Sequence, residues 1–138
     1  MKILTPAALP ATLAALALCA CSQGGGGQKA GDPSAGLDAE ILTWRETVEA
    51  SNPLCEAKVE GKGCESFEVV CKGAQELTPA DTAKGVTARI VVAMVFQAKA
   101  VEGSGGRPGS AFATFTRTPD GWTRAEAKPV NLQTCAAF

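Results

Sequence analysis

The clearest pattern of hydrophobic and polar positions runs from residue 86 to residue 101. Every even position in it is apolar: Val86, Ala88, Ile90, Val92, Met94, Phe96, Ala98 and Ala100. The odd positions are polar towards both ends and apolar in the middle. A period of two with many β-branched residues is typical of a strand. We therefore predict a long strand over 86–101, buried on one face throughout and on both faces at its middle. A buried helix is the alternative.

Two shorter strands are predicted after this one. The glycine-rich stretch 103–109 lacks the lysine and hydroxyl residue of a phosphate-binding loop, so we interpret it as a hairpin connection. A strand over 110–117 follows, and the Thr-Pro-Asp-Gly sequence at 118–121 is typical of a turn. The third strand is expected over 122–128. From Pro129 onward we expect irregular or edge-like chain.

A helix is predicted before the strands. Apolar residues recur at spacings of four, three and four, which places them on one helical face: Leu37, Ile41, Trp44 and Val48. Acidic residues stand in the favourable first turn, and the Ser-Asn-Pro sequence at 51–53 ends the helix. Trp44 is expected in the core. A second, very short helix is predicted to begin at Thr78 and to end at Gly85.

The order of these elements predicts an α+β fold. A helix followed by an antiparallel meander forms a curved antiparallel sheet with the N-terminal helix packed across one face. We assign residues 37–138 to this single domain. In outline the order resembles cystatin-like and NTF2-like domains, although no motif carries that likeness.

The first 21 residues have the pattern of a secretory leader. Lys2 is the only charged residue among them, and Leu and Ala dominate the stretch up to Ala20. Pro6 and Pro10 interrupt a continuous helix, and the glycine tract that follows has no basic stop-transfer cluster. A permanent single-span anchor is therefore the less favoured interpretation.

The end of this leader, Leu18-Cys19-Ala20-Cys21, resembles the processing site of bacterial lipoprotein precursors. The resemblance implies a signal peptide over 1–20 and a lipid-modified Cys21 carrying a diacylglyceryl thioether and an N-acyl group. The chain departs from the family pattern at Cys19, where a smaller residue is usual, and in having a single basic residue at its start. Lipidation at Cys19, or plain cleavage that leaves Cys21 a free thiol, are the rival interpretations.

The resemblance also implies a location. Ser22 after the modified cysteine implies transfer to the outer membrane, where the protein would be lipid-anchored on the inner leaflet and face the periplasm. Residues 21–36 are rich in glycine and are expected to form the lipidated tether. Several acyl chains hold a protein at a membrane far more firmly than one chain does.

Four cysteines remain after the leader and Cys21: Cys55, Cys64, Cys71 and Cys135. An even number suits disulfides in an oxidising periplasm, whereas the spacing and the absence of histidine do not suit zinc. Four cysteines allow three pairings. Residues 64–71 look extended, which would separate their ends by about 23 Å. Residues 60–63, in contrast, can reverse the chain between Cys55 and Cys64, so the favoured pairing is Cys55–Cys64 with Cys71–Cys135.

The composition excludes several function classes. Basic and acidic residues number 13 and 14, with no basic run, so no nucleic-acid partner is expected. Without histidine the chain lacks the commonest general base and any Ser-His or Cys-His nucleophile. Glu65 and Glu68 stand three apart on an extended segment and are expected to face opposite sides. We predict no catalytic, cofactor-binding or metal site.

The resulting functional prediction is a lipid-anchored envelope lipoprotein whose domain binds or assists another envelope protein without catalysis. The alternatives are a small apolar ligand-binding domain and an inhibitor of an envelope hydrolase. A cavity beneath Met94 and Phe96 would favour ligand binding. A polar surface through Arg89, Gln97 and Lys99 would favour a protein partner.

Overall fold

The computed structural model describes residues 32–58, 61, 63–99 and 106–138. The signal peptide predicted over 1–20, Cys21 and most of the expected tether lie outside the described residues. Within these ranges the elements are two α-helices, one 3₁₀ turn and four strands. In chain order they are α1 (Leu37–Ser51), η1 (Pro53–Cys55), β1 (Cys64–Ala74), α2 (Pro79–Ala83), β2 (Ala88–Ala98), β3 (Pro108–Thr118) and β4 (Gly121–Glu126).

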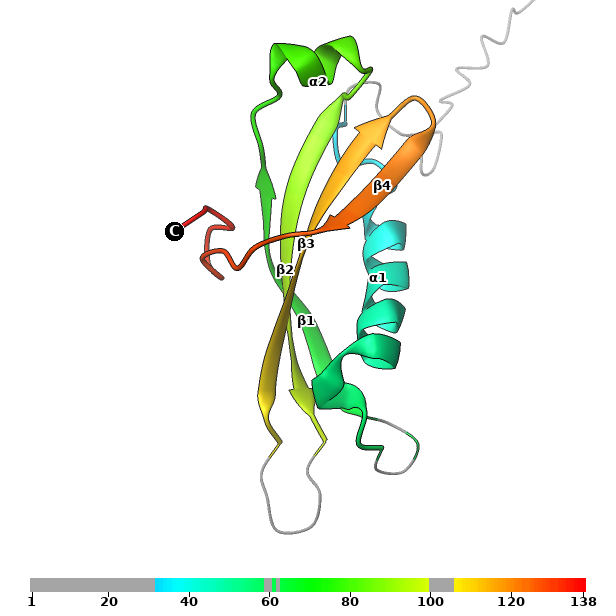
Figure 1. Ribbon diagram of the computed structural model, residues 1–138, viewed down its shortest axis with the longest axis vertical. Coiled ribbons are helices and arrows are strands. Elements are labelled where there is room, and N and C mark those ends of the chain that lie inside the picture. The colour runs from blue at the N-terminus through cyan, green and yellow to red at the C-terminus, as the bar shows by residue number, and fades with distance from the viewer. Residues whose placement is uncertain (1–31, 59–60, 62, 100–105) are drawn as a thin grey trace, which may run out of the picture.

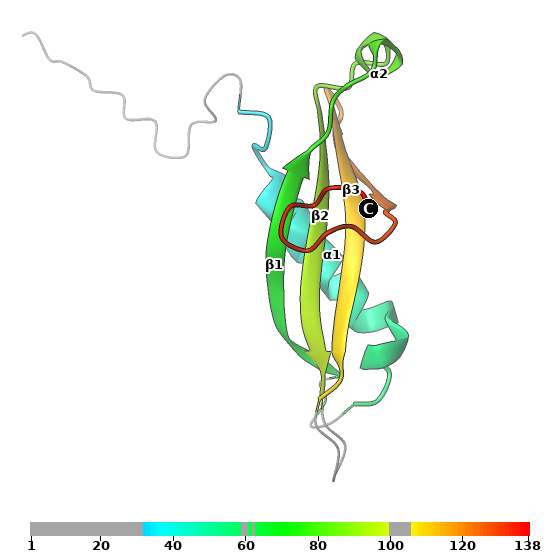
Figure 2. The same ribbon diagram turned by 90° about the vertical axis from the view of Figure 1, so that its left-hand side faces the viewer.

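The four strands form one antiparallel sheet in the order β1-β2-β3-β4. Figure 1 shows α1 lying along one face of this curved sheet, and Figure 2 shows the C-terminal segment crossing the other face. The predicted α+β class, with an N-terminal helix on an antiparallel sheet, is confirmed.

The face of the sheet under α1 holds the main core. The four apolar residues that predicted the helix are all buried, and Trp44 meets Phe115 edge-on with ring centroids 5.8 Å apart. The even-numbered residues of β2 from Ile90 to Ala98 belong to the same buried cluster and form its sheet side. Phe96 stacks on Phe67 of β1 at 5.3 Å. The helix and its buried face are as the sequence predicts.

The strand boundaries differ in part from those predicted. β2 is buried on both faces at its middle, as expected, but it begins at Ala88 and its described part ends at Ala98. β3 begins two residues earlier than predicted, because its pairing with β2 continues to Gln97 opposite Pro108. Proline is tolerated as the first residue of a strand, where no ladder donor is needed. β4 ends at Glu126, two residues before the predicted end.

β1 contains two bulges, and they overturn one prediction. Its register with β2 shifts between Glu65 and Glu68 and again between Val69 and Cys71, and Ser66 has a positive φ of 56°. Glu65 pairs with Gln97 and Glu68 pairs with Val95. Because those two β2 residues share a face, both glutamates lie on the same side of the sheet, and the prediction of opposite sides is wrong.

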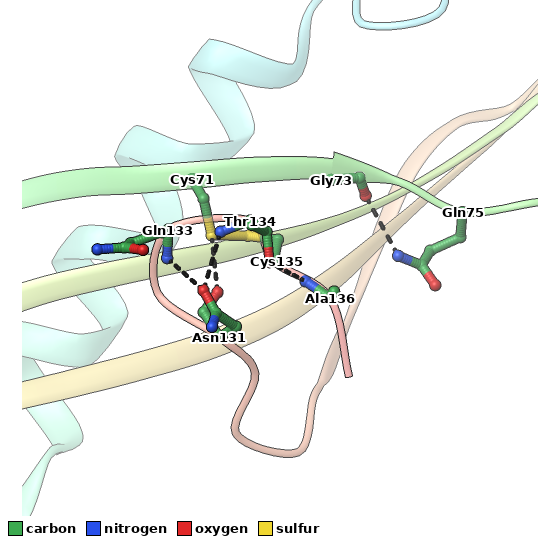
Figure 3. The surroundings of a disulfide bond; sticks show 8 residues. All are labelled: Cys71, Gly73, Gln75, Asn131, Gln133, Thr134, Cys135 and Ala136. Carbon is green, nitrogen blue, oxygen red and sulfur yellow. Dashed lines mark hydrogen bonds between the residues drawn. A yellow bond between two sulfur atoms is a disulfide. The ribbon is translucent and has the colours of Figure 1, made fainter. Parts of the chain in front are cut away.

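The other face of the sheet is covered by residues 129–138, which we call the C-terminal strap. Val130 and Cys135 pack on Val91 and Ala93 of β2. The strap is folded around Asn131, whose side-chain oxygen accepts hydrogen bonds from the backbone N–H groups of residues 133 and 134 (Figure 3). A Cβ atom at Gly73 would lie 2.8 Å from the Cβ of Cys135, so the strap lies directly against β1.

Candidate interaction cleft

An open cleft of about 510 Å³ lies between the C-terminal half of α1 and the edge of β3. Its lining comes from three parts of the chain. These are the end of α1 with the following turn, the first half of β3, and the segment just after β4: Trp44, Val48, Ser51, Asn52, Pro53, Ser110, Ala111, Phe112, Glu126, Ala127 and Pro129. Apolar side chains share these walls with hydroxyl, amide and carboxylate groups, and polar atoms make up the larger part of the exposed lining.

The unequal lengths of β3 and β4 create this cleft. β3 pairs with β2 without any bulge from Arg117 to Pro108. It pairs with β4 only as far as Ala113, which faces Glu126. One further hydrogen bond runs from the N–H of Ala127 to the carbonyl oxygen of Phe112, 3.1 Å away, and then the chain turns off towards the strap. Residues 108–112 are therefore left as an edge of the sheet.

The backbone of this edge offers hydrogen-bonding groups to the cleft. In an antiparallel strand, successive residues direct their N–H and C=O groups to opposite neighbours. The carbonyl of Arg107 accepts from Ala98 of β2, and the carbonyl of Phe112 accepts from Ala127. The odd residues therefore face β2. The N–H and C=O of Ser110 and the N–H of Phe112 face the cleft, where the described segments provide no partner.

The cleft carries little charge. Glu126 is the one ionisable residue in its lining, and it takes part in no ion pair within the described part of the chain. The side-chain oxygen of Asn52 is already used, because it accepts from the N–H of Leu54 at 3.0 Å. The arrangement is suited to binding an uncharged backbone with one cationic side chain.

The four mature cysteines form two disulfides, Cys55–Cys64 and Cys71–Cys135, with Cα atoms 5.0 and 5.7 Å apart. This is the pairing that the extended form of residues 64–71 favours, and the predicted presence of disulfides is confirmed. The first joins the end of η1 to the start of β1 within the main core. The second fixes the strap to β1 (Figure 3). Cys21 lies outside the described residues.

A polar cluster lies at the end of the sheet near α2. Asp81 closes a capping box with Thr78 and accepts from both terminal nitrogens of Arg89, at 2.5 and 2.9 Å. The backbone N–H of Thr78, the Arg89 guanidinium and the Thr78 hydroxyl together lower the pKa of Asp81 to about 2. Arg89, expected on a polar surface, instead ties α2 to β2, which is a structural role.

The space beneath β2 is filled by side chains. Met94 and Phe96 are each 1% exposed, and neither lines the cleft. Gln97 is exposed, whereas Lys99 is partly buried and lies 3.9 Å from Glu65. In the ranges that the structure describes, no three potential ligand residues are grouped to hold a metal ion, and no helix has the length and apolarity needed to cross a membrane.

Sequence reasoning missed the cleft. The third strand, predicted to run to Lys128, would in the observed register have covered Phe112 and Ala111 and left only residues 108–110 of the β3 edge open. Pro129 was the available signal, because a proline soon after a strand limits how far pairing can continue. No family model matches this chain, and neither the curated proteins nor the solved structures contain one similar to it.

Proposed function

We propose that this protein is a non-catalytic binding domain of the bacterial cell envelope that engages another envelope protein through the cleft beside β3. The observation that carries the proposal is the cleft itself, in which apolar and polar side chains adjoin backbone groups of β3 that have no partner among the described residues. Concave sites that combine apolar side chains with placed polar groups are typical of binding surfaces. A single carboxylate in the lining supports binding rather than catalysis.

Lipid attachment at Cys21 is part of this proposal. The leader that resembles those of lipoprotein precursors supports it, and the two disulfides suit an oxidising compartment. We place the domain on the inner leaflet of the outer membrane, facing the periplasm. The likeness to cystatin-like and NTF2-like domains remains one of outline, and the proposal takes nothing from it.

The test is site-specific photo-cross-linking in cells with the full chain. A cross-linking residue replaces Ser51 at the rim of the cleft, and a matched one replaces Glu76, which is exposed but outside the cleft lining. We expect Ser51 to join one protein at high yield and Glu76 not to join it. The captured protein, once purified, should bind the wild-type chain and bind Ser51→Arg more weakly. Equal capture from both positions, or none, contradicts the proposal.

The anchor is tested separately with Cys21→Ala. We expect this variant to leave the membrane fraction and to lose incorporation of labelled palmitate. If the variant stays in the membrane with unchanged labelling, the lipid is attached to a residue other than Cys21.

A further inference from the structure

We propose that the open edge of β3 receives an extended segment of the protein partner as an added strand, with a lysine or arginine of that segment paired to Glu126. The inference rests on the proposed function, because it specifies what the same cleft binds. Addition of a strand to a sheet edge is a recurrent mode of peptide recognition, in which main-chain hydrogen bonds provide much of the affinity.

Among the described residues, three backbone groups on the cleft side of β3 have no hydrogen-bond partner. Ser110 presents both its N–H and its C=O towards the cleft, and Phe112 presents its N–H. An extended peptide has the same alternation of donors and acceptors and can satisfy all of these groups together. The edge 108–112 spans about 16 Å, which suits a segment of roughly five residues.

The edge strand β1, at the other side of the sheet, is a poorer template for an added strand than the β3 edge. β1 is bulged twice and bears Glu65, Glu68 and Lys72, features that discourage pairing with another strand. The β3 edge belongs to a strand whose register with β2 is regular along its whole length. It is also the edge that borders the cleft. A regular strand beside an open cleft is the better template for an added strand.

The side chains of an added strand alternate between the two faces of the sheet. The cleft lining offers them Val48, Ser51 and Pro53 from the end of α1 and the following turn, and Pro129 from the segment after β4. Glu126 of β4 pairs with Ala113 of β3, and the side chain of Ala113 lies in the core under α1. The carboxylate of Glu126 is therefore also on the α1 side of the sheet. A cationic side chain of the segment that points to this side complements it.

The experiment uses a displayed library of random octapeptides selected on the purified full-length protein. We expect enrichment of peptides that contain a lysine or arginine. A synthetic enriched peptide should bind Ser110→Pro about tenfold or more weakly, because proline removes the N–H and adds bulk at the edge. The matched control is Arg124→Pro, a proline on the β4 edge outside the cleft lining, which should bind within about twofold of wild type.

Two further measurements do not depend on the folding of Ser110→Pro. In the wild-type protein, the peptide should slow amide hydrogen exchange at Ser110 and Phe112. Glu126→Gln should weaken binding about two- to fivefold, and this difference should shrink at high salt. The absence of enriched peptides, or unchanged exchange at both amides, overturns the inference. So does a wild-type dimer that Ser110→Pro converts to a monomer, because a second copy then occupies the edge.

Failure of this inference is distinguishable from failure of the proposed function. If the protein captured from Ser51 binds Ser110→Pro as tightly as it binds wild type, strand addition is wrong while the binding function stands. If Ser51 captures nothing in cells but selected peptides protect the Ser110 amide, the proposed binding of an envelope protein is wrong, while strand addition at the β3 edge stands.

Discussion

The two faces of the sheet are stabilised in different ways. Beneath α1, the structure describes thirteen buried residues in one cluster, including Trp44 and Phe115. Where the C-terminal strap packs on the sheet, the structure describes a cluster of four buried residues, two of them from the strap itself. The strap contains no helix or strand. The disulfide Cys71–Cys135 crosses the second face and joins residues 64 positions apart. Each face contains one disulfide, but the helix face has a large buried cluster around its disulfide, whereas the strap face has few buried residues and depends more on its covalent link.

The largest expected effect comes from removing the centre of the helix face. Trp44→Ala should lower the free energy of unfolding by about 4–5 kcal/mol, because a fully buried aromatic side chain is lost and a cavity remains. Leu42→Ala is the control on the same helix, since Leu42 is 61% exposed, and it should change stability by no more than about 0.5 kcal/mol. Urea unfolding with the disulfides intact measures both. Equal losses would contradict the assignment of the core.

The next effect comes from removing the link on the strap face. Replacing Cys71 and Cys135 together by alanine should cost about 4 kcal/mol, since the unfolded chain regains the freedom of a long closed loop. Amide hydrogen exchange separates the two faces. Strap amides such as that of Cys135 should exchange faster than global unfolding allows, while those of α1 should still exchange only through global unfolding. Equal acceleration in both regions would show that the faces unfold as one unit.

A smaller effect is expected where the strap lies against β1. Gly73→Ala places a methyl group 2.8 Å from the Cβ of Cys135 and should cost about 1–3 kcal/mol. In the variant that lacks Cys71 and Cys135 the strap can move away, so the same substitution should cost less. Urea unfolding of the four proteins in this cycle measures the coupling. An identical loss of unfolding free energy with and without the disulfide would mean that the strap is not in close contact with Gly73.

The smallest effect lies away from both faces, at Asp81. The folded state holds the pKa of this carboxyl at about 2, below the value of about 4 in an unfolded chain. Its ionised form therefore stabilises the fold above about pH 4, and this contribution is lost as the pH falls towards 2. Asp81→Asn should be less stable at neutral pH and should lose less stability on acidification. Urea unfolding between pH 2 and 6 tests this, and parallel pH profiles would contradict it.

Most of the helix face could be predicted from the sequence, because its residues repeat with the period of the element that contains them. The spacing from Leu37 to Val48 and the alternation along β2 each identify an element and its buried side. The disulfide pairing followed from the extended form of residues 64–71, which separates Cys64 from Cys71, and from the turn-forming sequence 60–63 between Cys55 and Cys64. In these cases the local pattern and the tertiary structure agree.

The bulges and the cleft could not be predicted in the same way. A bulge adds a residue without changing the composition of a strand, so Glu65 and Glu68 gave no sign that they share a face. The end of β4 depends on where the chain turns towards the strap, which is decided by the packing of Val130 and the Cys135 disulfide. These are long-range contacts, and apart from Pro129 no local pattern near residue 127 reports them.

The chain enters the domain at the end of α1 opposite the cleft, and under the proposed lipidation this position decides which end of the domain is closer to the anchor. The carbonyl groups of Asp32 and Ala35 accept hydrogen bonds from Arg117 and Trp122, at 2.9 and 2.8 Å, so the chain enters beside the β3–β4 turn. From there α1 runs about 22 Å to the cleft at its other end. Under the proposed lipidation, this entry point is the part of the domain joined most directly to the anchor, and the cleft lies at the far end of α1 from it. The domain would then meet proteins that approach from the aqueous side more readily than neighbours in its own leaflet.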